Sequence, residues 1–446
     1  MNEALPSRLC ATILPLLMLA AVPASAQDRR VVQEPGLPDR VCTSLAPDGQ
    51  DWPREMRRLQ SAIDHCAPGG AVRLTGAGRF VSGPLRMKSG VTLWLDRGAV
   101  LTAVPDPRAY DRGQGLCGTI AAKGNGCLPF LSFTGTRGGG IVGEGMIDGA
   151  GGAKLAGLDE SWWQRARRAQ REGGKQNNPR LIEATDARDL VFYRVTLHDA
   201  PNFHLVLDGV RGATIWGIRI DTPADARNTD GVDPGASQDV TIAHSFIRTG
   251  DDDIAIKAGH GPTRYVSILD DHFYSGHGVS IGSETNAGVS DILVRDVTLD
   301  GTTSGLRIKS DASRGGLVTR VRYEGVCLRD NQRPIDFDTR YDAGAIGMAI
   351  PVYRDITLHD VSGAGGTLVL RGHDPAHPMQ VTLDGVHFDR SARWQIDNAL
   401  LSAGPGGVSP VPPGLTVPPA PAAPGDCAAR WMPFPDGDSP APATRD

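Results

Sequence analysis

The sequence predicts an all-β protein, a right-handed parallel β-helix with a short N-terminal capping helix. From about residue 189 the pattern apolar-x-apolar-x-x-apolar-x-apolar recurs, and a short recurring unit of this kind is typical of a solenoid. Each unit alternates, is rich in β-branched residues and ends at Gly, Asn or Asp, which excludes helical repeats. Glycine accounts for 56 of 446 residues and aromatic residues for 5%, as in a turn-rich β protein.

The first residue of each unit gives the period of the repeat, which is about 25 residues. In a parallel β-helix, residues one period apart lie about 4.8 Å from each other, the ordinary strand spacing. A β-sandwich or barrel is the alternative, but Asn-Gly and Asp-Gly hairpin signals are not regularly placed. The marker residues are Leu190, Ala213, Val240, Val266, Ile292, Val321, Ile356 and Val381.

The N-terminus predicts export. Arg8 precedes an apolar run over 11–22, and Ala24-Ser25-Ala26 completes the order of a signal peptide, so we expect residues 1–26 to be removed. The run is shorter than the roughly 20 residues of a membrane-spanning helix. We therefore expect a secreted protein that has no membrane association after cleavage.

The mature chain divides into a β-helix over 27–402 and an irregular tail over 403–446, where Pro, Gly and Ala dominate. The spacing of Met56, Leu59, Ile63 and Cys66 predicts a helix that caps the sheet end, just before a first strand over 90–95. A second short helix is predicted over 161–171.

The number of cysteines and the net charge limit the kinds of partner that the protein can have. Six cysteines remain after the signal is removed, an even number that favours disulfides in an exported protein. Fifteen pairings are possible, and we favour those between sequence neighbours. Metal binding is the alternative, but no CxxC or paired Cys/His spacing supports it. The net charge of −5 argues against nucleic acid. We expect the disulfide pairs Cys42–Cys66, Cys117–Cys127 and Cys327–Cys427. We also expect a monomer without metal or cofactor.

Four short motifs follow one another along the chain: Asn228-Thr-Asp-Gly, Gly250-Asp-Asp-Asp, Gly276-His-Gly and Arg307-Ile-Lys. The intervals from Asp230 to Asp251, from Asp251 to His277 and from His277 to Arg307 are each close to one repeat. Any one motif alone would be read as a solvated turn, a calcium loop or a solvated strand face. Stacked coils bring all four into one patch.

This residue set suits the hydrolysis of a glycosidic bond, in which one carboxylic acid protonates the leaving oxygen and another activates water. Adjacent Asp251 and Asp252 provide the like charge that raises a carboxyl pKa. They reach one cleft only if the chain bends, which Gly250 allows. Arg307 and Lys309 share a strand face and can hold the carboxylate of an acidic sugar.

On these motifs the sequence resembles the polygalacturonases of glycoside hydrolase family 28, most of all bacterial endo-acting members, over 226–233 and 278–285. The resemblance implies an inverting mechanism on polygalacturonate (pectin), with Asp251 as general acid and Asp230 with Asp252 activating water. It also implies that His277 tunes the acid. Coil spacing alone permits either inversion or retention.

By the same resemblance, Asn228, Arg307, Lys309 and Tyr341 bind substrate, although a core or rim tyrosine is an equal alternative for Tyr341. His204, about one repeat before Asp230, lines the groove or is a turn histidine. Lys257 is interpreted as structural or solvated.

Other functions stay open at this stage. An exo-polygalacturonase or a rhamnogalacturonan hydrolase shares the acids, although the latter usually lacks Arg-Ile-Lys. A calcium-dependent pectate lyase or a non-catalytic pectin-binding solenoid would use the aspartates as ligands or turns. Because the general acid must keep a proton, a hydrolase predicts a mildly acidic pH optimum.

Overall fold

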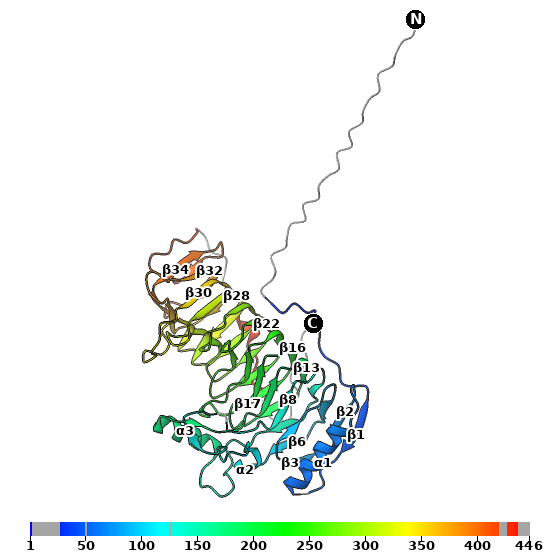
Figure 1. Ribbon diagram of the computed structural model, residues 1–446. Coiled ribbons are helices and arrows are strands. Elements are labelled where there is room, and N and C mark those ends of the chain that lie inside the picture. The colour runs from blue at the N-terminus through cyan, green and yellow to red at the C-terminus, as the bar shows by residue number, and fades with distance from the viewer. Residues whose placement is uncertain (2–26, 50, 125, 419–425, 436–446) are drawn as a thin grey trace.

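The computed structural model describes residue 1 and residues 27–49, 51–124, 126–418 and 426–435. The signal peptide predicted over 1–26 therefore lies, apart from residue 1, outside the described residues. Two long parallel sheets of 22 and 11 strands run along the molecule (Figure 1). Each central coil places one strand in the smaller sheet, then a long and a short strand in the larger one. One such coil is β15 (Leu205–Asp208), β16 (Arg211–Trp216) and β17 (Arg219–Asp221). The predicted parallel β-helix is confirmed.

The predicted repeat gives the register of the long strands. Leu190 pairs with Ala213, Ala213 with Val240, and so on through Ile356 and Val381, so that all seven expected neighbours are paired. All eight marker residues are at most 2% exposed and form one row of the core. The other long strands are β13 (Arg188–Tyr193), β19 (Gln238–Ala243), β22 (Thr263–Leu269), β25 (Val289–Arg295), β28 (Gly316–Arg329), β30 (Pro351–Gly363) and β32 (Met379–Phe388).

The residue before most of these core residues has a left-handed backbone conformation, which explains why Asp and Gly recur there in the repeat. Asp189, Gly212, Asp239 and Asp291 have φ of 56°, 81°, 58° and 60°. Gly adopts this region freely, and Asp more readily than most other residues. The local bend therefore recurs once per coil and keeps the coils in register.

The remaining strands follow the same order along the solenoid. The smaller sheet contains β4 (Leu85–Arg86), β8 (Leu131–Thr134), β12 (Ile182–Thr185), β18 (Val232–Gly235), β21 (Ile254–Ile256), β24 (Val279–Gly282), β27 (Ser304–Lys309), β29 (Arg333–Asp338), β31 (Thr367–Arg371) and β33 (Arg393–Asp397). The short strands of the larger sheet are β10 (Met146–Asp148), β14 (Thr196–His198), β20 (Phe246–Arg248), β23 (His272–Phe273) and β26 (Thr298–Asp300).

The N-terminal end is closed by the predicted helix, α1 (Trp52–His65), whose Leu59 and Ile63 are fully buried. The strand predicted over 90–95 is present as β5, but strands β1 to β4 precede it, so the prediction that it is the first strand was wrong. Strands this short do not show a clear alternation in sequence. The strands of this end in the larger sheet are β1 (Val41–Leu45), β2 (Ala71–Leu74), β3 (Gly78–Ser82), β5 (Thr92–Leu95), β6 (Ala99–Ala103) and β9 (Gly140–Val142).

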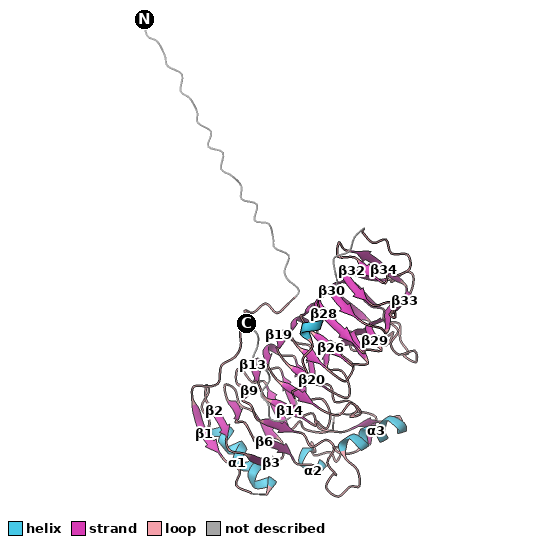
Figure 2. Cartoon of the chain, turned by 180° about the vertical axis from the view of Figure 1, so that it is seen from behind, coloured by secondary structure: helices cyan, strands magenta, loops and turns pink. Residues whose placement is uncertain are grey.

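The second predicted helix is α3 (Trp162–Glu172), which begins at a capping box of Ser161 and Gln164 and ends at left-handed Gly173. A short α2 (Pro107–Tyr110) lies nearby. The three α-helices of the described chain gather at the N-terminal end of the solenoid (Figure 2). Among the described residues, no helix is long and apolar enough to cross a membrane.

Both ends of the described chain lie against the outside of the coils. Near the N-terminus, Arg29 pairs with Asp239 and the Asp28 carboxylate accepts a hydrogen bond from Thr241. The segment 426–435, with the 3-10 turn η1 (Ala428–Arg430), also folds back. There the guanidinium of Arg248 lies over the Phe434 ring at 3.9 Å.

The larger sheet continues past residue 402 through β34 (Ala399–Ala403) and β35 (Val408–Ser409). The paired strands therefore end later than the predicted boundary. The three predicted disulfides are present, Cys42–Cys66, Cys117–Cys127 and Cys327–Cys427.

Candidate active site

The predicted motifs meet in one open cleft of about 650 Å³. Its centre is built from the loops that join a short strand of the larger sheet to the next strand of the smaller sheet: β17 to β18, β20 to β21, and β23 to β24. Because successive coils stack in register, residues that follow the same strand in each coil become neighbours. The predicted residues that line this cleft are Asn228, Asp230, Asp251, Asp252, His277, Lys309 and Tyr341.

Asp251 and Asp252 both reach the cleft because they lie in a loop between β20 and β21. Gly250 serves this loop by close packing, because a Cβ there would lie 2.1 Å from the carbonyl oxygen of Ala226 on the preceding coil. The third acid, Asp253, points away and is fully buried. Its carboxylate accepts hydrogen bonds from the Thr249 hydroxyl at 2.9 Å and the Gly278 amide at 3.1 Å, which anchors the Gly-His-Gly loop.

Cations and a hydroxyl hold the Asp252 carboxylate. Lys309 Nζ lies 2.6 Å from Oδ2, Arg307 Nη1 lies 3.4 Å from Oδ1, and Ser280 Oγ donates to Oδ1 at 2.7 Å. Asp252 and Lys309 are 2% and 7% exposed, so little water screens their attraction. Ser280 was not predicted, although it lies in the resemblance over 278–285 and about one repeat after Asp252.

Asp251 contacts His277 and Asn228. Its Oδ1 is 3.3 Å from His277 Nδ1, and its Oδ2 accepts from Asn228 Nδ2 at 3.4 Å. Burial alone would raise the pKa of Asp251, but the hydrogen bond and charge of the imidazolium outweigh it and hold that pKa below its ordinary value. Asp251 is therefore ionised in the free protein.

Asp230 belongs to a buried group with Lys257 and Asp233. Lys257 Nζ lies 3.1 Å from Asp230 Oδ2 and 2.7 Å from Asp233 Oδ2. One ammonium faces two buried carboxyls, so burial raises the pKa of Asp230 well above its ordinary value and that of Asp233 to about 6. Lys257 is thus structural rather than solvated, and its spacing of about one repeat from Asp230 is the signal that could have placed it in the site.

His204 does not line the cleft. It is fully buried, and its Nδ1 donates to the backbone oxygen of Asp230 at 3.0 Å while Nε2 accepts from the Thr222 hydroxyl at 2.7 Å. Burial lowers the pKa of His204 to about 4, so the ring stays neutral. Of its two sequence interpretations, the groove residue was wrong, because the ring points inward and supports the Asp230 loop.

Tyr341 is a rim residue, 46% exposed, and stands over the cations behind Asp252. Its ring centroid is 5.2 Å from the Arg307 guanidinium and 5.4 Å from Lys309 Nζ. Arg307 is mostly buried, with 11% of its side chain exposed, and lies between Asp252 and Asp336. It therefore fixes Asp252 in the free protein, whereas Lys309 and Tyr341 line the open cleft.

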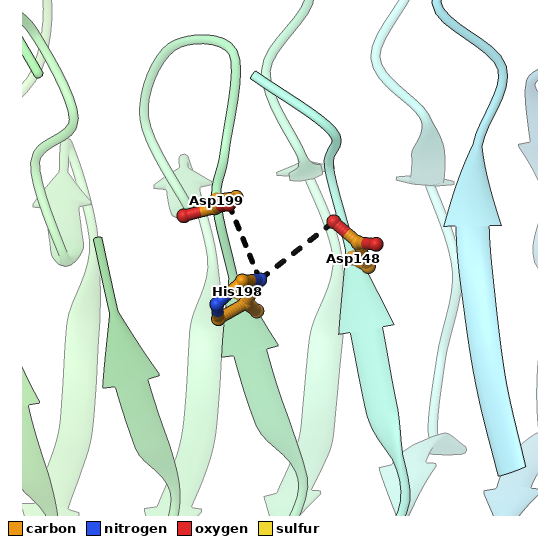
Figure 3. Close-up of side chains that lie close together, drawn as sticks. All are labelled: Asp148, His198 and Asp199. Atoms are coloured by element: carbon orange, nitrogen blue, oxygen red, sulfur yellow. Dashed lines mark ion pairs between the residues drawn. The ribbon is translucent and has the colours of Figure 1, made fainter. Parts of the chain in front are cut away.

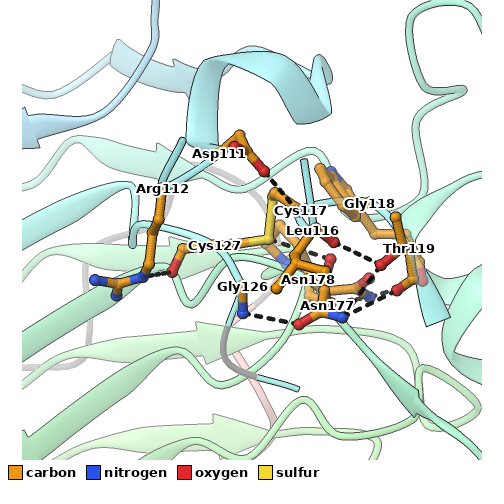
Figure 4. The surroundings of a disulfide bond; sticks show 12 residues. Asp111, Arg112, Leu116, Cys117, Gly118, Thr119, Gly126, Cys127, Asn177 and Asn178 are labelled. Atoms are coloured by element: carbon orange, nitrogen blue, oxygen red, sulfur yellow. Dashed lines mark hydrogen bonds between the residues drawn. A yellow bond between two sulfur atoms is a disulfide. The ribbon is translucent and has the colours of Figure 1, made fainter. Parts of the chain in front are cut away.

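A loop closed by Cys117–Cys127 supports the N-terminal end of the cleft (Figure 4). The Asp111 carboxylate accepts hydrogen bonds from the amides of 113–115, just before this loop, and from the Cys117 amide at 2.9 Å. Beyond Cys117, β7 (Ile120–Ala121) pairs with β11 (Lys175–Gln176). The Gln176 amide then donates to Asn228 Oδ1 at 2.9 Å, which links this loop to the coil that carries Asn228 and Asp230.

Among the residues that the structure describes, two groups of side chains have donor atoms close enough to surround a cation. One is Asp251, Asp252 and His277, whose atoms lie within 4.8 Å of one another, but both Asp252 oxygens already face Lys309, Arg307 or Ser280. The other is Asp148, His198 and Asp199, at the ends of β10 and β14 (Figure 3). Its His198 Nδ1 lies 3.7 Å from Asp148 and 3.5 Å from Asp199, outside the cleft.

Comparisons with known proteins agree with this geometry. Residues 84–404 match the family described as Glycosyl hydrolases family 28. The chain belongs to this family. It is 42% identical over 399 residues to an endo-polygalacturonase of Pectobacterium carotovorum subsp. carotovorum, covering 88% of this chain and 98% of the relative. It is also 42% identical over 382 residues to a polygalacturonase of Ralstonia solanacearum, covering 74% and 72%.

Solved structures of proteins named polygalacturonase or exopolygalacturonase resemble it as well. A polygalacturonase from Erwinia carotovora ssp. carotovora superposes with a TM-score of 0.82 at 42% identity, covering 84% of this chain and all of the other. An exopolygalacturonase from Thermotoga maritima shares the fold, with a TM-score of 0.69 at 19% identity over 86% of this chain and 93% of that one. The chain is therefore a glycoside hydrolase.

Proposed function

We propose that this protein is an endo-polygalacturonase that hydrolyses α-1,4-galacturonosyl linkages of polygalacturonate. The observation that carries the proposal is the set Asp230, Asp251 and Asp252 in one open cleft that Lys309 also lines. Carboxyl groups supply the acid and base of glycoside hydrolysis, and a cation at their edge attracts the carboxylate of an acidic sugar. The likeness to relatives named endo-polygalacturonase supports the same substrate.

In the proposed mechanism, Asp251 protonates the leaving oxygen and receives its proton from His277, which lies 3.3 Å away. Asp230 and Asp252 position and deprotonate the attacking water, and the product has inverted configuration. Asp230, which is protonated in the free protein, must lose its proton before it acts as a base. The ammonium of Lys257, 3.1 Å from Asp230, favours the ionised form of Asp230.

Endo action and secretion are further parts of the proposal. The open cleft lets a polymer enter from the side and extend beyond both ends of the reacting centre. The three disulfides suit an oxidising compartment outside the cytoplasm. We expect a monomer that leaves the cytoplasm through its N-terminal signal.

A time course on polygalacturonate tests the function. Reducing ends should increase without any rise in ultraviolet absorbance, in the presence or absence of a chelator, and early products should be mixed oligomers. Monomer or dimer as the sole early product would mean exo action. An unsaturated, absorbing product that a chelator suppresses would instead indicate a calcium-dependent lyase and would overturn the proposal.

A further inference from the structure

The two ends of the cleft carry opposite charge. On the side of the N-terminal coils, Arg167 of α3, Lys175 of β11 and Arg227 line the cleft, and we call these three residues the basic end. On the side of the C-terminal coils, Asp311 and Asp342 line it, and we call these two the acidic end. Asp230, Asp251 and Asp252 lie between them.

The charges of the basic end are available to a ligand. Within the part of the chain that the structure describes, none of the three cations pairs with a carboxylate: Arg167 donates to the backbone oxygen of Asp225 at 2.5 Å, and Arg227 to Asn228 Oδ1 at 3.0 Å. Other basic side chains of the cleft behave differently. Lys257, Lys309 and Arg314 each face a protein carboxylate, at 2.7, 2.6 and 3.4 Å respectively.

The carboxylates of the acidic end also have no cationic partner among the described residues. Asp342 accepts the Gly344 amide at 2.8 Å and is exposed, while Asp311 is 3% exposed and accepts from the Ser313 amide at 2.9 Å. A free galacturonate carboxylate is attracted to the basic end and repelled at the acidic end. A methyl ester is neutral, so it loses the attraction at one end and escapes the repulsion at the other.

We propose that the two ends of the cleft differ in their preference for free or methyl-esterified galacturonate residues of pectin. The segment over the basic end must carry free carboxylates, whereas the segment over the acidic end is accepted better as its methyl ester. The protein then cuts where un-esterified stretches border esterified ones. This inference rests on the proposed function, because it concerns the same cleft and substrate.

The first test compares two variants on un-esterified polygalacturonate. The double variant R167Q/K175Q removes two exposed cations of the basic end and should raise KM about tenfold. R171Q is the matched control, since Arg171 is exposed on the same helix but does not line the cleft, and its KM should stay at the wild-type value. D342N should raise kcat/KM on this substrate about threefold. Melting curves confirm that each variant is folded.

The second test digests polygalacturonate with randomly placed methyl esters and sequences the products by mass spectrometry. Esters should be concentrated beside one kind of new end, reducing or non-reducing, and depleted beside the other. Equal distribution beside both ends, or equal KM for R167Q/K175Q and R171Q, overturns the inference while wild-type activity remains. If the proposed function itself is wrong, the result is different, because the wild-type protein then releases no reducing ends from polygalacturonate.

Discussion

At the residue scale, burial and contacts with neighbouring coils give the clustered aspartates different charge states. Asp251 faces His277 and its pKa is held low, whereas Asp230 is deeply buried and its pKa is raised. Asp253, next in sequence to Asp252, is buried and satisfied by Thr249 and Gly278. Differences of this kind between adjacent carboxyls allow one site to supply both an acid and a base.

Removal of His277 should move the alkaline limb of the pH–rate profile. In H277Q, the proton must reside on Asp251 alone, and a carboxyl releases its proton at lower pH than an imidazole. We expect the alkaline limb of kcat/KM on polygalacturonate to shift down by about 1–2 pH units. H260Q is the control, because His260 is exposed and does not line the cleft. An unchanged alkaline limb in H277Q would contradict the transfer of a proton from His277 to Asp251.

Sequence predicted these residues unevenly. A spacing close to one repeat was enough to bring Asp230, Asp251 and His277 together, because one period equals one coil. It could not tell that His204 turns inward, since both of its ring nitrogens find partners only in the folded coil. The spacing of Lys257 from Asp230, about one repeat, could have placed it near the site, but a lone Lys gives no sign of the burial that makes it pair with Asp230.

At the element scale, regular coils were predicted and irregular additions were not. The marker row from Leu190 to Val381 reproduced the observed strand register, since core packing requires the same apolar alternation in every coil. Strands β1 to β4 and the segments at both ends of the described chain lack that alternation. Their placement depends on specific contacts, such as Asp28 with Thr241, and Arg248 with Phe434.

The Cys117–Cys127 loop should affect substrate binding more than its small size suggests. In C117S/C127S, the β7–β11 pairing loosens and both Lys175 and Gln176 lose their support, so we expect KM to rise several-fold. The loss of folding stability should be about 2–3 kcal/mol. C42S/C66S is the control, because that disulfide ties α1 at the far end and should reduce stability at unchanged KM. Equal KM values in both double variants would contradict this role of the loop.

At the scale of the whole molecule, buried aspartates make stability depend on pH. Burial raises the pKa of Asp271 to about 7 and that of Asp233 to about 6. A carboxyl whose pKa is raised by folding is protonated in the folded state. Its contribution to the free energy of unfolding is complete below the pKa of the unfolded state, near 4, and is lost as pH rises through the pKa of the folded state. The protein should therefore be most stable in mild acid.

D271N should flatten this dependence. Asp271 is fully buried and accepts the Ser245 amide at 2.7 Å, and Asn keeps the neutral form at every pH. Between pH 4 and 7 the wild-type unfolding free energy should fall by up to about 4 kcal/mol more than that of D271N. Denaturant unfolding at several pH values measures it. D355N, at an exposed position of β30, should behave as wild type, and parallel curves for D271N and wild type would contradict the argument.

The catalytic role of the aspartates in the cleft is tested most directly by kcat of D251N on polygalacturonate, measured as released reducing ends. The substitution keeps the side-chain shape but cannot donate the proton of a carboxylic acid, so kcat should fall at least about a hundredfold. The melting temperature should stay near that of the wild type, because Asp251 lies in an open loop. A folded D251N protein with near wild-type kcat would contradict the assignment.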